Sequence, residues 1–121
     1  MVYRDAFEPL RHVVLEDSWV LSLSRDDQSL AFDLEVALSP DHQHYRPPAP
    51  GEQHCYLRAQ LCIGGDMTCA MSDAPPATDA RGSKDHGHID VWTVDEDGVS
   101  RLEGDWGTVE VRSTAVTLSF T

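Results

Sequence analysis

Long apolar runs are absent from this chain. No stretch approaches the ~20 consecutive apolar residues that a membrane-spanning helix needs. Arg4, Asp5 and Glu8 interrupt the beginning of the chain, where a secretory leader would carry its apolar segment. We therefore expect neither a signal peptide nor a membrane span, and the simplest expectation is a cytoplasmic protein.

Cysteine is scarce, and its spacing matches no known framework. Cys55, Cys62 and Cys69 are odd in number and show no Cys-x-x-Cys spacing, so neither a disulfide scaffold nor a zinc site of cysteines is indicated. We expect three reduced, structural thiols.

Basic residues are few. Lys and Arg number 9 against 21 Asp and Glu, and the net charge is −12. A chain this acidic should repel phosphate backbones, so nucleic-acid binding is disfavoured. Its negative field suits a basic protein partner, or simply keeps the protein in solution as a monomer.

The common enzyme motifs are missing as well. No Gly-x-Ser-x-Gly occurs, and Gly64-Gly65 lacks the Gly-Lys-Ser/Thr of a phosphate-binding loop. Acid pairs such as Asp33 and Glu35 fall on a strand face that should be wet. We expect no catalytic residue and no cofactor; a small hydrolytic or metal-binding enzyme using scattered His and Asp residues, or a structural domain without a ligand, are the alternatives.

Helical periodicity is absent over any stretch of ten residues, and alternation takes its place. From Leu30 to Leu38 every even position is large and apolar, and Trp19–Arg25 alternates similarly. A period of two indicates strands with one buried face, and the polar residues between these segments predict a β-hairpin.

Further short strands continue this pattern and predict one all-β domain over residues 1–121, either an antiparallel β-sandwich or a partly open barrel of about eight short strands. The expected core is Leu21, Leu23, Leu30, Phe32, Leu34, Val36, Leu57, Leu61, Val109, Val111, Val116, Leu118 and Phe120.

Three segments should interrupt or connect the later strands. Gly64–Asp66 predicts a tight reversal followed by a short returning strand, Met67–Met71. The apolar residues change from odd to even sequence positions across Ser113–Thr114. This change indicates a hairpin turn or a bulge. Ser72–Gly87 shows no periodicity and is expected to be the most mobile loop.

Histidines form two closely spaced pairs, His42 with His44 and His86 with His88. Residues two apart on an extended backbone face the same way, so each pair could offer two imidazoles to one metal ion. A third ligand at fixed spacing is missing, and histidines are also ordinary in polar loops, so this remains the weaker interpretation.

A proline-rich connection supplies the first candidate surface. Three prolines within Pro47–Pro50 impose an extended path, and a stiff loop presents Tyr45, Arg46 and Tyr56 to a partner at small entropic cost. Covering the core is the alternative role for such aromatics.

Trp92 is the second candidate. It falls among the outward positions if Ile89 and Val91 face inward. A wet tryptophan on an acidic protein would be a partner hot spot, so Trp92 joins Tyr45, Arg46 and Tyr56 as a predicted partner-binding residue.

Three stretches together carry a resemblance: 45–56 (YRPPAPGEQHCY), 87–92 (GHIDVW) and 102–111 (LEGDWGTVEV). With the hairpin before them, they resemble a group of small uncharacterised bacterial all-β proteins of unknown function. The resemblance implies a bacterial, cytoplasmic all-β domain and brings no activity or cofactor. A fainter likeness, in size, charge and strand pattern, is to small acidic immunity proteins that neutralise toxins.

Overall fold

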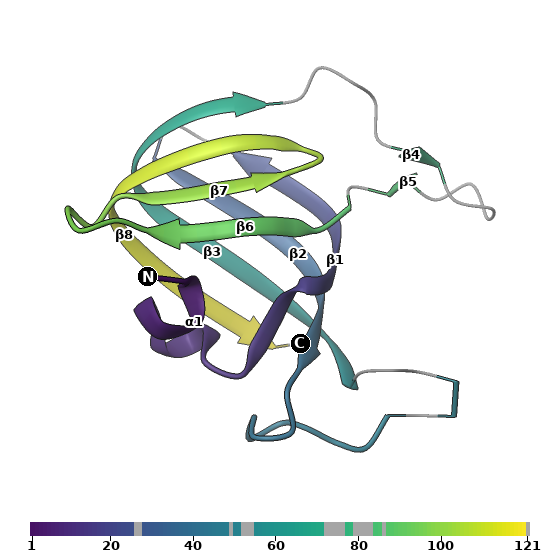
Figure 1. The fold of residues 1–121 in the computed structure, drawn as a ribbon. Coiled ribbons are helices and arrows are strands. Elements are labelled where there is room, and N and C mark those ends of the chain that lie inside the picture. Colours follow the sequence, from purple (N-terminus) through teal and green to yellow (C-terminus); the bar gives the residue numbers. More distant parts are fainter. Residues whose placement is uncertain are drawn as a thin grey trace.

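The computed structural model describes residues 1–25, 28–48, 50–51, 55–71, 77–78, 84–85 and 87–120. The strands in these ranges are antiparallel, and six of them form a single curved sheet in the order β1-β2-β3-β8-β7-β6 (Figure 1). The predicted all-β class is therefore confirmed. No helix in this part of the chain is long and apolar enough to cross a membrane.

The elements follow one another along the chain as α1 (Tyr3–Ala6), the 3-10 turn η1 (Glu8–Leu10), β1 (Val13–Arg25), β2 (Ser29–Leu38), β3 (Cys55–Met71), β4 (Ala77–Thr78), β5 (Lys84–Asp85), β6 (Ile89–Val94), β7 (Ser100–Gly104) and β8 (Gly107–Phe120). Strands β4 and β5 form a separate two-stranded sheet. Most of the predicted mobile loop, together with Asp26–Asp27, Ala49, 52–54 and His86, lies outside the described residues.

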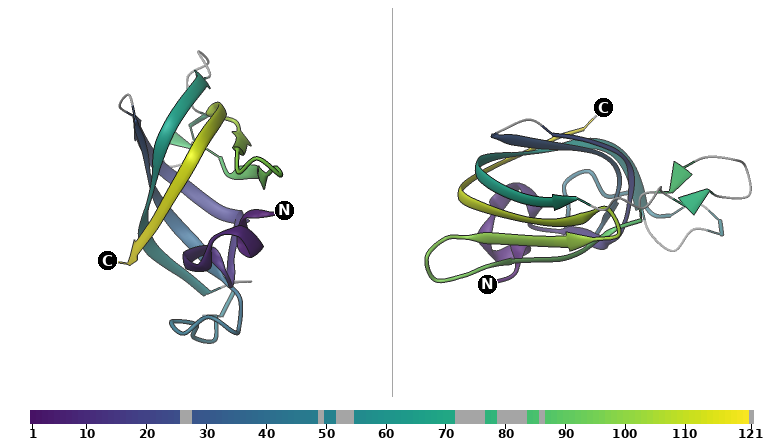
Figure 2. Two further views of the ribbon diagram at one scale, coloured as in Figure 1. Left: turned by 90° about the vertical axis from the view of Figure 1, so that its left-hand side faces the viewer. Right: turned by 90° about the horizontal axis from the view of Figure 1, so that it is seen from above.

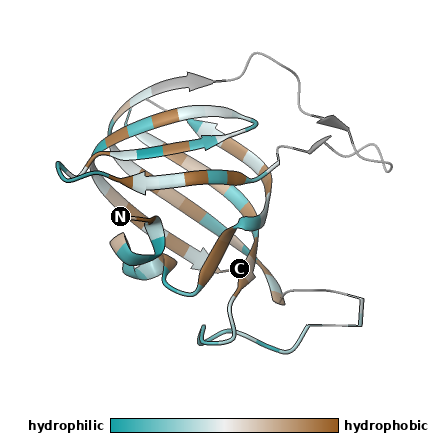
Figure 3. Ribbon diagram, in the orientation of Figure 1, coloured by the Kyte–Doolittle hydropathy of each residue, from teal (hydrophilic) through white to brown (hydrophobic). Residues whose placement is uncertain are grey.

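The predicted hairpin is present as β1 and β2. Leu23 pairs with Phe32 and Arg25 with Leu30. On β2 the alternation places Leu30 and Phe32 inward, and both are completely buried. Figure 3 shows the resulting bands of apolar and polar residues along the strands.

Strands β3 and β8 are longer than the sequence predicts. The chain does not reverse at Gly64–Asp66; that prediction is wrong, because β3 continues through these residues beside β8. Gly64 pairs with Ala115 and Asp66 with Arg112, so Ser113–Thr114 faces a single residue of β3. This is the bulge that the change from odd to even positions indicated as an alternative to a turn.

The bulge helps to bend the sheet back over itself. Strands β6 and β7 thereby come to lie across the core from β1 and β2 (Figure 2). The N–H of Val20 donates to the carbonyl of Gly87 at 2.9 Å, which ties β1 to the segment before β6. Six of the described strands thus form one continuous open sheet, and of the two predicted architectures the sandwich is not confirmed.

Two irregularities in β1 change which face its side chains occupy. Its pairing with β2 shifts register between Val14 and Trp19 and again between Val20 and Ser22. Val20 is consequently buried, while Trp19 is 42% exposed. Leu21 is only half-buried and lies outside the core, so its predicted place there is wrong.

The other predicted core residues are confirmed, and they fall into two groups by their degree of burial. The completely buried members are Leu30, Phe32, Leu34, Val36, Leu61, Val109 and Val111. The partly buried members that pack against them are Leu23, Leu57, Val116, Leu118 and Phe120. The second group gathers near strand ends, where the sheet encloses the core less completely.

Tyr3 and Leu10, from α1 and η1, complete the core; both are buried. The Tyr3 hydroxyl accepts the N–H of Leu15 at 2.9 Å and lies 3.0 Å from Oε2 of Glu16. Burial raises the pKa of Tyr3 well above its ordinary value. The N-terminal segment is thus held in place by its own buried side chains.

Candidate functional site

An open groove of about 630 Å³ lies between η1, the loop after β2 and the end of β8. We call it the histidine groove, because His12, His42 and His44 line it together with Phe120. Leu118 adds apolar surface, and Glu8, Arg11 and Asp41 supply charges of both signs. The groove therefore combines titratable rings with an apolar floor.

Two of the imidazoles and the phenyl ring form one cluster. The ring centroids of His42 and His44 are 5.5 Å apart, and that of Phe120 lies 5.4 Å from His42 and 4.9 Å from His44. The local turn explains this: the N–H of His42 donates to the Ser39 carbonyl, and the N–H of Tyr45 to the His42 carbonyl.

His42 is held as a neutral ring. Its Nδ1 accepts the backbone N–H of His44 at 3.0 Å, which requires that nitrogen to be unprotonated. Burial, and then the nearby imidazoles of His44 and His12, lower the pKa of His42. The His42 ring can therefore offer flat, uncharged surface near neutral pH.

His12 has an unusual backbone. Its φ is +70°, in the left-handed region that side-chain-bearing residues rarely adopt. Its carbonyl accepts the N–H of Ser39 at 2.9 Å, which fixes the start of β1 against the end of β2. This role could not be predicted from the sequence, because His12 stands thirty residues from His42 with no shared motif.

Of the predicted metal-binding histidines that the structure describes, His42 and His44 come together in the groove, whereas His88 is far from them. His88 lies at the β1–β6 seam, where its Nδ1 is 2.5 Å from the carbonyl oxygen of Ser18 and its ring is 4.4 Å from that of Trp19. His86 lies outside the described residues. Among those that are described, no three His, Cys, Asp or Glu side chains are placed to share a metal ion.

The prediction that Trp92 faces outward is wrong. Trp92 is only 2% exposed, and its ring stacks on Tyr3 with a centroid distance of 6.0 Å. The cause is an irregularity in β6. Ile89 pairs with Gly104 but Val91 pairs with Glu103, so two steps along β6 match one step along β7. Side chains beyond this point therefore lie on the opposite face from the one that regular alternation predicts. Val91, not Trp92, faces solvent.

The other predicted partner residues lie around the base of the loop after β2. Tyr45 is half-buried and packs against the core, whereas Arg46 is exposed. The N–H of Arg46 points to Sγ of Cys55 at 3.4 Å, which brings this loop close to the start of β3 and to Tyr56. Their role in partner binding stays a prediction. Cys55 and Cys62 are free thiols, as expected.

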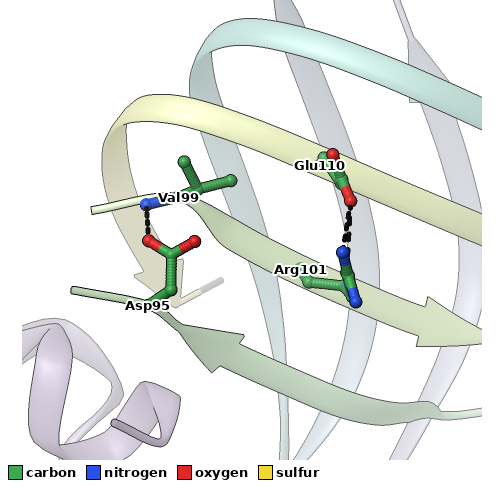
Figure 4. Close-up of polar contacts among 4 residues, drawn as sticks. All are labelled: Asp95, Val99, Arg101 and Glu110. Carbon is green, nitrogen blue, oxygen red and sulfur yellow. Dashed lines mark hydrogen bonds and ion pairs between the residues drawn. The ribbon is translucent and has the colours of Figure 1, made fainter. Parts of the chain in front are cut away.

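A second surface, which the sequence did not single out, is the hairpin of β6 and β7. We call residues 90–105 the acidic hairpin, because it carries exposed carboxylates on both strands and at both ends: Asp90, Asp95, Glu96, Asp97, Glu103 and Asp105. Its single basic residue, Arg101, donates to Oε1 of Glu110 at 2.7 Å (Figure 4). That contact raises the pKa of Arg101 further above its ordinary value.

The turn of the acidic hairpin is ordered by one side chain. Oδ1 of Asp95 accepts the N–H of Val99 at 3.0 Å (Figure 4). It also accepts the N–H of Asp97 at 2.9 Å. The backbone of Asp95 also bonds to Val99 and Gly98. The acidic residues Asp95–Asp97 thus form the turn together with Gly98, as Asp followed by Gly commonly does, and Glu96 and Asp97 are exposed.

Comparison with known proteins adds no relative. No family model, no curated protein and no solved structure matches the chain. The assignment of function therefore rests on the geometry of these surfaces.

Proposed function

We propose that this protein is an acidic binding module, and that it docks a basic protein partner on the acidic hairpin. The observation that carries the proposal is the imbalance of charge on this one element. Six carboxylates are exposed along it, while its only cation is already paired with Glu110. Few cations of the protein itself would therefore compete with a basic partner for these carboxylates.

Preorganisation supports the same proposal. The Asp95 side chain holds the turn through two backbone N–H groups, so little loop entropy is lost when a partner docks. Val91, 38% exposed and paired across the strands with Glu103, adds an apolar contact beside the acids. Acidic surface around a small apolar centre is a suitable site for an arginine- or lysine-rich segment.

The net charge of the protein supports the same proposal. The net charge of −12 would steer a basic partner toward the protein and accelerate association at low salt. An immunity or antitoxin role in a bacterial cytoplasm would be one instance of this function. The enzyme alternative has less support, since the three groove histidines form no hydrogen bond to a carboxylate among the described residues.

The test is a pull-down from the native cell at low and high salt. We expect a stoichiometric partner whose retention weakens as salt rises. A Glu96→Gln/Asp97→Asn variant should lose it, because two exposed charges are removed without disturbing the turn that Asp95 holds. The matched control is Asp66→Asn/Glu35→Gln, which removes two charges from β3 and β2 and should retain the partner.

A further arm tests the surface predicted from the proline loop. Tyr45→Ala/Tyr56→Ala should weaken retention if that surface also takes part; since Tyr45 packs on the core, folding of this variant is checked by circular dichroism. The proposal fails if no partner is retained at any salt while a substrate screen finds turnover that one His or Asp substitution abolishes.

A further inference from the structure

A smaller cavity of about 360 Å³ adjoins the histidine groove. We call it the arginine cavity; Val2, Arg4, Asp5, Arg11, His12 and Ser39 line it. Arg11 and His12 line both hollows. The two are therefore neighbouring parts of one surface, at the N-terminal segment and not on the acidic hairpin.

The two arginines that line this cavity have no carboxylate partner within the part of the chain that the structure describes. Among the described residues neither Arg4 nor Arg11 forms an ion pair, and Asp5 forms none either. The Arg4 guanidinium lies over the face of Tyr3, with its Cζ 5.7 Å from the ring centroid. Arg4 and Arg11 outnumber Asp5 on the lining of this cavity, so in a chain with 21 acidic and 9 basic residues the cavity carries a local excess of positive charge.

The backbone around the cavity holds His12 in an unfavourable conformation. A φ of +70° at a residue with a side chain costs of the order of 1 kcal/mol. The hydrogen bond from Ser39 to the His12 carbonyl maintains it. Such local strain is concentrated at binding sites, and here it belongs to one of the two residues that line both hollows.

We propose that these two hollows together bind a planar organic anion. The carboxylate or phosphate of the ligand lies in the arginine cavity, where Arg4 and Arg11 donate charge-assisted hydrogen bonds and the His12 imidazole is within the same lining. The planar body lies in the histidine groove against His42, His44 and Phe120, whose rings supply flat apolar surface.

The remaining charges restrict the ligand further. Glu8 and Asp41 line the groove but not the arginine cavity. They would repel a second anionic group at the far end of the ligand and accept hydrogen bonds from neutral donors there. The site therefore favours molecules with negative charge at one end only. This inference is independent of the acidic hairpin.

Small probes test the ligand class directly. Purified full chain is titrated with benzoate, phenyl phosphate, cyclohexanecarboxylate and benzamide, and binding is followed by calorimetry and by the NMR signals of the histidine rings. We expect benzoate or phenyl phosphate to bind most tightly, cyclohexanecarboxylate less, and benzamide not measurably. Shifts should appear at His12, His42 and His44.

Variants then locate the anion. Arg4→Gln and Arg11→Gln should each weaken benzoate binding by about tenfold or more, the usual effect of losing a hydrogen bond to a charged group. Arg112→Gln, which removes an equal charge from the outer face of β8, should leave it unchanged. Circular dichroism verifies that each variant is folded.

Several results would overturn the inference. These are the absence of binding by either aromatic anion, equal binding of benzamide and benzoate, or an equal effect of Arg112→Gln and Arg11→Gln. Glu96→Gln/Asp97→Asn should bind the probes normally, so a failure here and a failure of the protein-partner proposal can be told apart.

Discussion

The phenolic oxygen of Tyr3 lies 2.9 Å from the backbone nitrogen of Leu15 and accepts its hydrogen bond inside the protein. This contact joins the N-terminal helix to the first irregularity of β1, where the strand has left its partner. Both residues are buried, so no water can replace the hydroxyl.

Tyr3→Phe should therefore lower the free energy of unfolding by about 1–3 kcal/mol, because it leaves the buried N–H of Leu15 without an acceptor. Tyr45→Phe is the matched control; its hydroxyl has no hydrogen bond among the described residues, and the change should be within about 0.5 kcal/mol. Urea denaturation measures both. Equal stabilities of the two variants would contradict this role of Tyr3.

Ser18 should be similarly important for the same part of β1. Its hydroxyl donates to the Val14 carbonyl at 2.7 Å and accepts the N–H of Ala37 at 2.8 Å. Ser18→Ala breaks both bonds in a buried place and should cost about 1–3 kcal/mol by urea denaturation. Ser24→Ala, on an exposed position of the same strand, should be nearly neutral; a comparable loss there would point to a general effect of serine on β1.

Gly104 is required by the packing of Trp106. The indole Nε1 of Trp106 donates to the carbonyl of His88 at 3.2 Å, and a Cβ on Gly104 would overlap both of these atoms. Gly104→Ala should destabilise the fold by about 1–3 kcal/mol, as overpacking does. At Gly64 the nearest atom would be 3.8 Å away, so Gly64→Ala should be tolerated. Thermal unfolding measures both variants. A lower melting temperature for Gly64→Ala than for Gly104→Ala would contradict this role of Gly104.

Stability should also depend on pH through His42. Because its pKa is lowered in the folded state, the unfolded chain binds a proton more readily, and the free energy of unfolding should fall as pH drops below about 6.5 and through the lowered pKa. Above about pH 6.5 both states are neutral at this site, and the contribution is constant.

His42→Gln keeps an acceptor for the His44 N–H and removes the titration. Urea denaturation of both proteins between about pH 7.5 and about pH 5.5, above the range where carboxylates titrate, isolates this effect. The variant should lose less stability over that interval. An equal loss would mean that His42 does not carry the pH dependence.

The sequence predicted the parts of the fold that follow a regular alternation. β2 is an example: each even residue from Leu30 to Leu38 is buried. Prediction failed where a bulge breaks that period, since a slip of one residue exchanges the two faces. Leu21 and Trp92 were both assigned to the wrong environment for this reason, and the irregular pairing that moved them cannot be read from residue type.

The candidate surfaces were less predictable still. His42 and His44 were found through their spacing, but His12 and Arg11 reach the same groove only because the N-terminal segment packs beside β8. The value of the acidic hairpin as a surface depends on Arg101 being paired with Glu110 across the sheet. These residues come together through contacts between distant parts of the chain, and local sequence patterns do not predict such contacts.

The proposed role in binding a basic partner is tested most directly by the salt dependence of association with the captured partner. Rates are measured at about 50 mM and about 500 mM salt, where screening differs strongly. For the natural protein we predict an association rate that falls at least about tenfold over this range, and for Glu96→Gln/Asp97→Asn a slower rate at low salt with a shallower fall. An association rate insensitive to salt, or unchanged by the hairpin substitutions, would contradict the proposal.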